Sequence, residues 1–259
     1  MAAAGKIDPM HQFTVEPLVP LHIGHYDISL TNSAAWMIAA MAIVALFMWG
    51  GMRRQLVPGR WQMAVEGFTG FIDNLIHVNI GPEGKKFAPF IFSLFSFILV
   101  ANLLGMLPLA VVPGWHAFAS TSHFSITGVL AILSFSIVLV VGFWKHGFHF
   151  FSLFLPEGTP IYMAPLIVPI EIVSFLVRPF SLALRLFVAM MAGHILMEVF
   201  GSFIVNGLNS GSVMGFGVGF VSFLFIVGVG ALELLICALQ AYVFALLTTL
   251  YLNDAVNLH

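Results

Sequence analysis

The pattern of hydrophobic and polar positions divides this chain into long apolar runs separated by short polar segments. Five runs reach the roughly 20 residues that an α-helix needs to cross a bilayer. They cover residues 33–52, 87–107, 124–144, 165–200 and 213–252. The last two exceed the length of a perpendicular span, so we expect these helices to be strongly tilted or bent.

Two other stretches complete the predicted architecture. Turn-forming residues between the fourth and fifth runs predict a hairpin there: Gly201, Gly207, Asn209 and Gly211. Residues 60–80 mix aromatic and aliphatic positions with acidic ones, which is typical of an amphipathic helix lying in the membrane interface. We therefore predict an all-α, polytopic membrane protein. It would form one membrane domain over residues 1–259, with an outside segment at 1–32 and a long, tilted C-terminal helical hairpin.

Composition supports this class and excludes several others. The chain is 60% hydrophobic and only 8% charged, with a mean hydropathy of +1.05, whereas soluble domains are about 25% charged. A net charge of −2 supplies no basic field for nucleic acid. A single cysteine, Cys237, excludes an internal disulfide and any cysteine-based metal site. We find no metal-ligand cluster, cofactor motif or nucleophile–base arrangement, so we expect no cofactor, no bound metal and no catalysis by this chain alone.

The distribution of Lys and Arg predicts the orientation of the spans. Residues 108–122 and 201–212 contain neither, whereas the segments after the first and third runs are basic: Arg53, Arg54, Arg60, Lys85, Lys86 and Lys145. This asymmetry predicts an outside N-terminus and a cytoplasmic C-terminus. The N-terminal residues lack the features of a cleavable signal or transit peptide. We therefore expect a multi-pass protein of a bacterial inner (plasma) membrane.

Ionisable residues inside the last two runs are the candidate functional groups. They are Glu171, Arg178, Arg185, His194 and Glu198 in the fourth run and Glu233 in the fifth. A charge near the bilayer centre costs roughly 2.5–3.5 kcal/mol on insertion scales, so such residues mark a water path, a proton relay or a buried pair.

Their spacing predicts how they meet across the hairpin. Glu171, Arg178 and Arg185 follow one another at intervals of seven residues, nearly two helical turns, and share one helical face. Glu233 and Gln240 share a face of the fifth run for the same reason. In an antiparallel hairpin, residues at equal depth have numbers with a constant sum. Arg185 with Gln240 sums to 425 and His194 with Glu233 sums to 427. We therefore expect two facing polar pairs, the second about 13 Å nearer the outside.

These layers predict a proton route interrupted by a fixed charge. A His194–Glu233 pair can exchange protons near neutral pH. Arg185 cannot lose its proton and would act as a barrier, while Glu171 and the neighbouring Ser174 lie towards the inside. Structural roles stay open for some of these residues. Arg178, which precedes Pro179, could be a snorkelling residue or part of a helix kink, and Glu198 could simply face water. His194 and Glu233 could form a static buried pair.

Four segments carry a resemblance to one family. SLALRLFVAMMAGH (residues 181–194) resembles the signature of subunit a of F-type ATP synthases, with Arg185 at the place of the family's essential arginine. Residues 232–252 are similar to its last helix, including Glu233 and Gln240. ANLLGMLP (residues 101–108) and IEIVSFLVRP, which carries Glu171 and Ser174, match two further motifs. The pattern departs at Ala189, where the family usually has Asn, so the role of that Asn is not carried over.

The resemblance implies a function. Protons would enter through His194, Glu233 and Gln240, neutralise carboxylates of a c-subunit ring, and leave towards Glu171 and Ser174, with Arg185 preventing a direct leak. The implied partners are the c-ring, subunit b of the stator stalk, the lipid bilayer and the transported H⁺. H⁺ is favoured over Na⁺ because an imidazolium at His194 would repel Na⁺.

Two other functions compete with this one. A secondary transporter would have inverted repeats and broken helices at the midplane, and we find no repeat in the chain. A structural membrane scaffold would leave Arg185, His194 and Glu233 without a reason to be buried.

Overall fold

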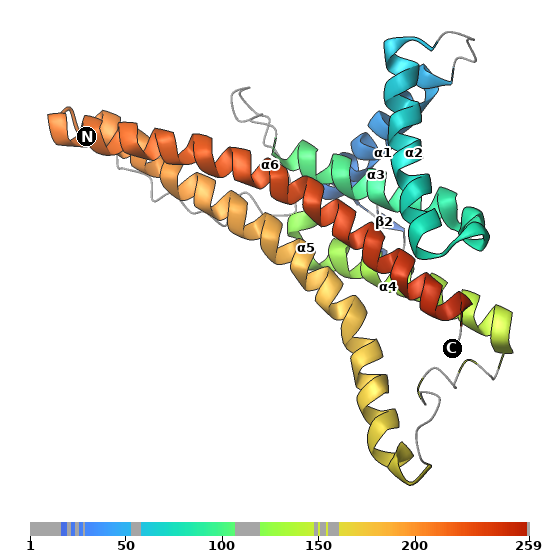
Figure 1. Ribbon diagram of the computed structural model, residues 1–259. Helices are drawn as coiled ribbons and strands as arrows, with labels where there is room; N and C mark the ends of the chain where they lie inside the picture. The colour runs from blue at the N-terminus through green and yellow to red at the C-terminus, as the bar shows by residue number, and fades with distance from the viewer. Residues whose placement is uncertain are drawn as a thin grey trace. The chain divides into compact units, whose positions relative to one another are not determined.

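The computed structural model describes residues 17–19, 22–23, 26–27, 29–52, 58–106, 120–147, 150, 154 and 161–257. Five helices in this part of the chain are long and apolar enough to cross a membrane. They are α1 (Asn32–Gly51), α3 (Ala88–Gly105) with the preceding 3₁₀ helix η2 (Pro82–Phe87), α4 (Phe124–His146), α5 (Ala164–Asn209) and α6 (Val213–Val256). In Figure 1 the colour of these helices follows the chain, from blue in α1 to red at the end of α6. The predicted polytopic all-α class is confirmed.

The remaining described elements are short, apart from one helix. α2 (Arg60–Asn79) occupies nearly the range predicted for the interfacial helix. Near the N-terminus, four strands of two or three residues form two small antiparallel pairs: β1 (Pro17–Val19) with β4 (Leu30–Thr31), and β2 (His22–Ile23) with β3 (Tyr26–Asp27). The sequence pattern did not predict them. Two further 3₁₀ helices are η4 (Ser120–Ser122) and η6 (Ile161–Met163). Several parts of the predictions lie outside the described residues: most of the N-terminal segment 1–32, Arg53 and Arg54, and residues 107–119, which include the end of the second run and most of the loop after it.

The chain packs into two compact units, which are described separately. Unit 1 comprises residues 1–40, 99–123 and 186–239, and unit 2 comprises residues 41–98, 124–185 and 240–259. α5 and α6 each contribute to both units. The expectation of one membrane domain over residues 1–259 stays a prediction.

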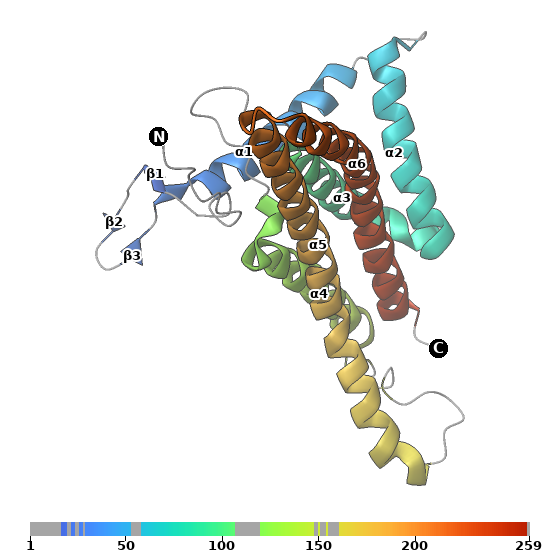
Figure 2. The same cartoon turned by 90° about the vertical axis from the view of Figure 1, so that its left-hand side faces the viewer.

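Unit 1 is built on an antiparallel contact between the second half of α5 and the first half of α6. These segments lie side by side in both views (Figures 1 and 2). Phe200 and Phe225 stack across the contact, with ring centroids 5.2 Å apart and an interplanar angle of 4°. The two residue numbers sum to 425, which agrees with the constant sum expected for residues at equal depth in the hairpin.

The turn of the hairpin is tighter than predicted. Gly211 adopts a positive φ of 61° and forms the turn, but Gly201 and Gly207 lie inside α5, so their assignment to the turn was wrong. Gly207 is needed for close packing: an added Cβ would lie 2.5 Å from the carbonyl oxygen of Gly215 and 3.1 Å from the nitrogen of Gly219. Small residues of this kind let two membrane helices approach closely.

Unit 2 packs α2 against the helices around it through one hydrophobic face. Val65, Ile72, Leu75 and Ile76 are buried at helical spacing, which explains why this charged segment forms an amphipathic helix. Phe68 of α2 lies 5.6 Å from Phe92 of α3, measured between ring centroids. At the start of α2, the indole of Trp61 donates a hydrogen bond to the carbonyl oxygen of Phe47 at 3.0 Å, so the end of α1 is tied to the same unit.

Candidate functional site

The central feature of unit 1 is a buried pair between α5 and α6. His194 Nε2 lies 3.9 Å from Glu233 Oε1, and the exposed fractions of the two side chains are 9% and 2%. The predicted facing of these residues across the hairpin is therefore confirmed. Neither carboxylate oxygen of Glu233 accepts a hydrogen bond from the described residues. Such a group is expensive to bury, which makes it a candidate for function rather than packing.

A glycine makes room for this carboxylate. An added Cβ at Gly193 would lie 2.5 Å from Glu233 Oε1 and 2.7 Å from Glu233 Cδ. Any larger residue at position 193 would therefore occupy the place of the carboxyl group. Gly193 had no predicted role, although it stands directly before His194.

One turn after Glu233, α6 is tightly packed around Cys237. Cys237 is fully buried, and its sulfur lies 3.6 Å from the sulfur of Met190. The side-chain amide of the fully buried Asn102 donates a hydrogen bond to the Cys237 carbonyl oxygen at 3.4 Å. The dense packing on this side fixes the backbone that carries Glu233 and leaves Cys237 without access to solvent.

Unit 2 holds the other predicted site residues. Arg185 is exposed, and the structure gives it no hydrogen bond or ion pair to any described residue. Gln240 is partly buried, and no described contact joins it to Arg185, so that predicted pairing stays a prediction. Ser174 is exposed on α5.

Glu171 belongs to an ion-pair cluster that was predicted only in part. Arg178 Nη2 lies 3.8 Å from Glu171 Oε1, and Arg178 Nη1 donates to Asp254 Oδ2 at 3.0 Å. The guanidinium also lies over the rings of Phe175 and Tyr251, 5.8 and 5.2 Å from their centroids. Arg178 thus bridges α5 to the end of α6, which favours a structural role beyond snorkelling. One sequence signal could have identified Asp254: it lies 14 residues, or twice seven, beyond Gln240 and so falls on the same helical face as Glu233 and Gln240.

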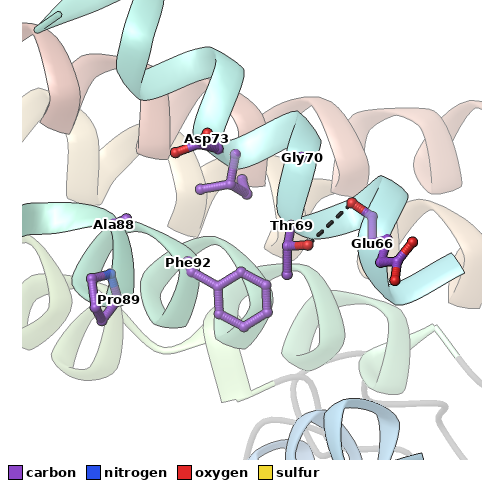
Figure 3. Close-up of a pocket in the computed structure, with 8 residues that line it drawn as sticks. Glu66, Thr69, Gly70, Asp73, Ala88, Pro89 and Phe92 are labelled. Carbon is purple, nitrogen blue, oxygen red and sulfur yellow. Dashed lines mark hydrogen bonds between the residues drawn. The ribbon is translucent and has the colours of Figure 1, made fainter. Parts of the chain in front are cut away.

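A hollow between two helices of unit 2 contains no polar pair comparable to His194 and Glu233. It has a volume of about 490 Å³ and lies between α2 and the start of α3, with Glu66, Thr69 and Asp73 on one side and Pro89 and Phe92 on the other (Figure 3). The Thr69 hydroxyl donates to backbone carbonyls of its own helix, as the dashed line to Glu66 shows. The Glu66 carboxylate accepts a hydrogen bond from Gln62 at 2.8 Å. The Thr69 hydroxyl and the Glu66 carboxylate thus have their hydrogen-bond partners within α2, and no nucleophile–base pair is found among the described lining residues.

Comparisons with known proteins identify relatives over the whole chain. The family described as "ATP synthase A chain" matches residues 34–253. ATP synthase subunit a of Erythrobacter litoralis is 62% identical over 261 residues, covering 100% of this chain and 99% of that protein. ATP synthase subunit a of Sphingopyxis alaskensis is 63% identical over 260 residues, with the same coverage. The protein of that name from Rhodospirillum rubrum is 44% identical over 252 residues, covering 97% of this chain and 99% of the relative.

Proposed function

This chain belongs to the ATP synthase A chain family, and from that premise we propose that it conducts protons through two offset half-channels separated by Arg185. Proton flow through them would drive rotation of a c-ring and so ATP synthesis. At the level of the family, the chain is a proton-translocating, multi-pass membrane subunit of the ATP synthase complex and not the catalyst of that complex.

The outer half-channel would end at His194 and Glu233. The observation that carries the proposal is the separation of 3.9 Å between their polar atoms in a buried environment. This distance exceeds a direct hydrogen bond, so a proton would pass through one bridging water or after a small side-chain rotation. Gln240, seven residues beyond Glu233 on α6, would continue the polar face towards the ring.

Arg185 would separate the two half-channels. A guanidinium keeps its proton at any physiological pH, so it attracts an ionised carboxylate and cannot relay a proton. Its exposure, together with the lack of an ion pair to any described residue, suits a cation whose counter-charge belongs to another subunit. We propose that this partner is the buried carboxylate of each c-subunit in turn.

The inner half-channel would start at Glu171 and Ser174. Glu171 is partly exposed and faces the cationic side chain of Arg178, and Ser174 is exposed about one turn further along α5. A proton released by a ring carboxylate would leave past these groups. Each charge that crosses gains about 2.3 kcal/mol per 100 mV of membrane potential, so several protons are needed for each ATP.

The remaining parts of the proposal concern the membrane, the orientation of the chain and the subunits next to it. We propose that the chain lies in a bacterial inner membrane with its N-terminus outside and its C-terminus in the cytoplasm, on the basis of its Lys and Arg distribution. It would contact the c-ring through α5 and α6 and subunit b elsewhere on its surface.

The test is ATP-driven proton pumping in inverted membrane vesicles. Arg185→Ala and Glu233→Gln should abolish pumping while the complex still assembles and hydrolyses ATP. Arg60→Ala and Glu66→Gln make the same chemical changes at exposed positions of α2 and serve as matched controls. Normal pumping by Glu233→Gln would mean that the outer half-channel runs elsewhere. Normal pumping by Arg185→Ala would overturn the proposed function.

A further inference from the structure

A groove in unit 2 lies beside the last turns of α4. It has a volume of about 380 Å³ and combines two kinds of lining. Val140, Val141 and Trp144 of α4 supply apolar lining, and Glu83, Lys86 and Lys145 supply charged lining. Neither the proton path nor the ion-pair cluster at Arg178 uses any of these residues.

The groove lies where a membrane helix meets water. α4 is an apolar helix of 23 residues that ends at Lys145 and His146, so its last turn must lie near the lipid headgroups. Trp144 is 87% exposed, and tryptophan in this position is typical of the membrane–water interface. Val140, one turn earlier and 58% exposed, therefore faces the hydrocarbon region.

The charges of the groove favour an anion. Lys145 forms an ion pair with Glu83 at 2.5 Å. Lys86 is exposed, and the structure gives it no hydrogen bond or ion pair to a described residue. Two lysines against one glutamate leave the groove with one net positive charge. An exposed ammonium group that makes no ion pair of its own can bind one oxygen of a phosphate.

The floor of the groove is held in place before any ligand arrives. Val256, near the end of α6, is 3% exposed and lines the groove. The His146 ring nitrogen lies 3.0 Å from the Val256 carbonyl oxygen, to which it can donate a hydrogen bond. With the Lys145–Glu83 pair, this contact fixes the end of α4 to α6 and η2. A preformed site loses less entropy on binding than a flexible one.

We propose that this groove binds one anionic phospholipid, with the phosphate at Lys86 and Lys145 and an acyl chain along Val140, Val141 and Trp144. Basic pockets between membrane helices bind anionic headgroups in this way, and each lysine near the surface strengthens binding of an anionic lipid. A zwitterionic lipid would gain less from the lysines, because its own cation lies next to its phosphate. The site therefore selects by headgroup charge.

The test uses the assembled ATP synthase reconstituted into phosphatidylcholine vesicles that contain a trace of photoreactive lipid. The lipid carries its reactive group on the acyl chain, and its headgroup is either phosphatidylglycerol or phosphatidylcholine. The measurement is the amount of label on residues 140–147. We expect phosphatidylglycerol to label this segment several-fold more than phosphatidylcholine. Lys86→Gln should lower phosphatidylglycerol labelling about fivefold, the effect of one lysine on the affinity for an anionic lipid.

Two further variants separate a site from general surface charge. Lys85→Gln removes the same charge from the adjacent exposed position, which does not line the groove, and should leave the labelling unchanged. Val140→Trp fills the groove without a change of charge and should lower labelling by both lipids. Equal labelling of the wild type by the two lipids would overturn the proposal, as would equal losses from Lys85→Gln and Lys86→Gln. Proton pumping by each variant reports assembly and does not depend on the lipid result.

Discussion

Gly193→Ala is the smallest change that should displace the proposed proton-carrying carboxylate. The substitution adds one methyl group and leaves Glu233 and His194 chemically intact. The added Cβ would lie 2.5 Å from Glu233 Oε1, 2.7 Å from Cδ and 3.1 Å from Cγ. We expect the variant to assemble and to pump protons poorly, because the carboxyl group cannot stay where it is.

The size of the effect follows from these distances. Ordinary van der Waals contact begins near 3.4 Å, so Glu233 Oε1 must move by about 0.9 Å or more. Overpacking of this kind costs about 1–3 kcal/mol. A misplacement of about 1 Å near reacting groups can lower a rate 100-fold. We therefore expect proton pumping to fall at least tenfold, while the content of this chain in membranes changes little.

The chain offers a matched control on the same helix. Gly201 also lies in α5, and apart from its chain neighbours and the adjacent backbone of its own helix, no described atom lies within 4 Å of a Cβ built at that position. Gly201→Ala should pump normally, since alanine is a better helix former than glycine. Glu233→Asp shortens the side chain by one methylene, and combined with Gly193→Ala it should recover part of the lost pumping. Equal pumping by Gly193→Ala and Gly201→Ala in ATP-driven acidification of inverted vesicles would refute the reasoning.

Two other features give predictions of smaller effect. The Arg178–Asp254 pair is partly exposed, so Arg178→Gln and Asp254→Asn should each lower the stability of the complex by less than about 1 kcal/mol. The double variant should lose less stability than the two single variants added together. Thermal unfolding measures these losses, and strict additivity would show that the two side chains do not interact. Burial lowers the pKa of His123 from its ordinary value of 6.5, so its contribution to stability is present above pH 6.5 and is lost as the pH falls. His123→Gln should therefore reduce the drop in Tm on acidification, and an unchanged drop would count against this residue.

The sequence could predict the main pair of the site because two simple rules apply to it. Apolar runs of sufficient length predicted five spans, and a constant sum of residue numbers predicted that His194 faces Glu233. The second rule holds because both helices rise equally from one short turn at Gly211. The rule does not depend on where α5 ends, so the wrong assignment of Gly201 and Gly207 to the turn did not affect it.

The same rule could not predict the partner of Arg178. A sum near 427 places Thr249 level with Arg178, but the observed partner is Asp254, and the two numbers sum to 432. The difference is five residues, about 7.5 Å along a helix. A long arginine side chain can reach that far along the neighbouring helix. Counting by depth locates backbones, whereas ion pairs are made at the ends of flexible side chains. The short N-terminal strands and the room at Gly193 were missed for a related reason, since each depends on contacts that carry no periodic signal.

The contacts of unit 1 also explain why the buried pair needs the glycines near the turn. Gly207 with Gly219 sums to 426 and Met190 with Cys237 sums to 427, so the close glycine contact, the His194–Glu233 pair and the sulfur contact share one register. Each residue inserted into either helix would rotate everything beyond it by about 100° and carry Glu233 off the shared face. Close backbone approach at Gly207 therefore sets the register that buries the His194–Glu233 pair. Because the pair is buried, a carboxyl group and an imidazole 3.9 Å apart can hold a proton between them without losing it to water.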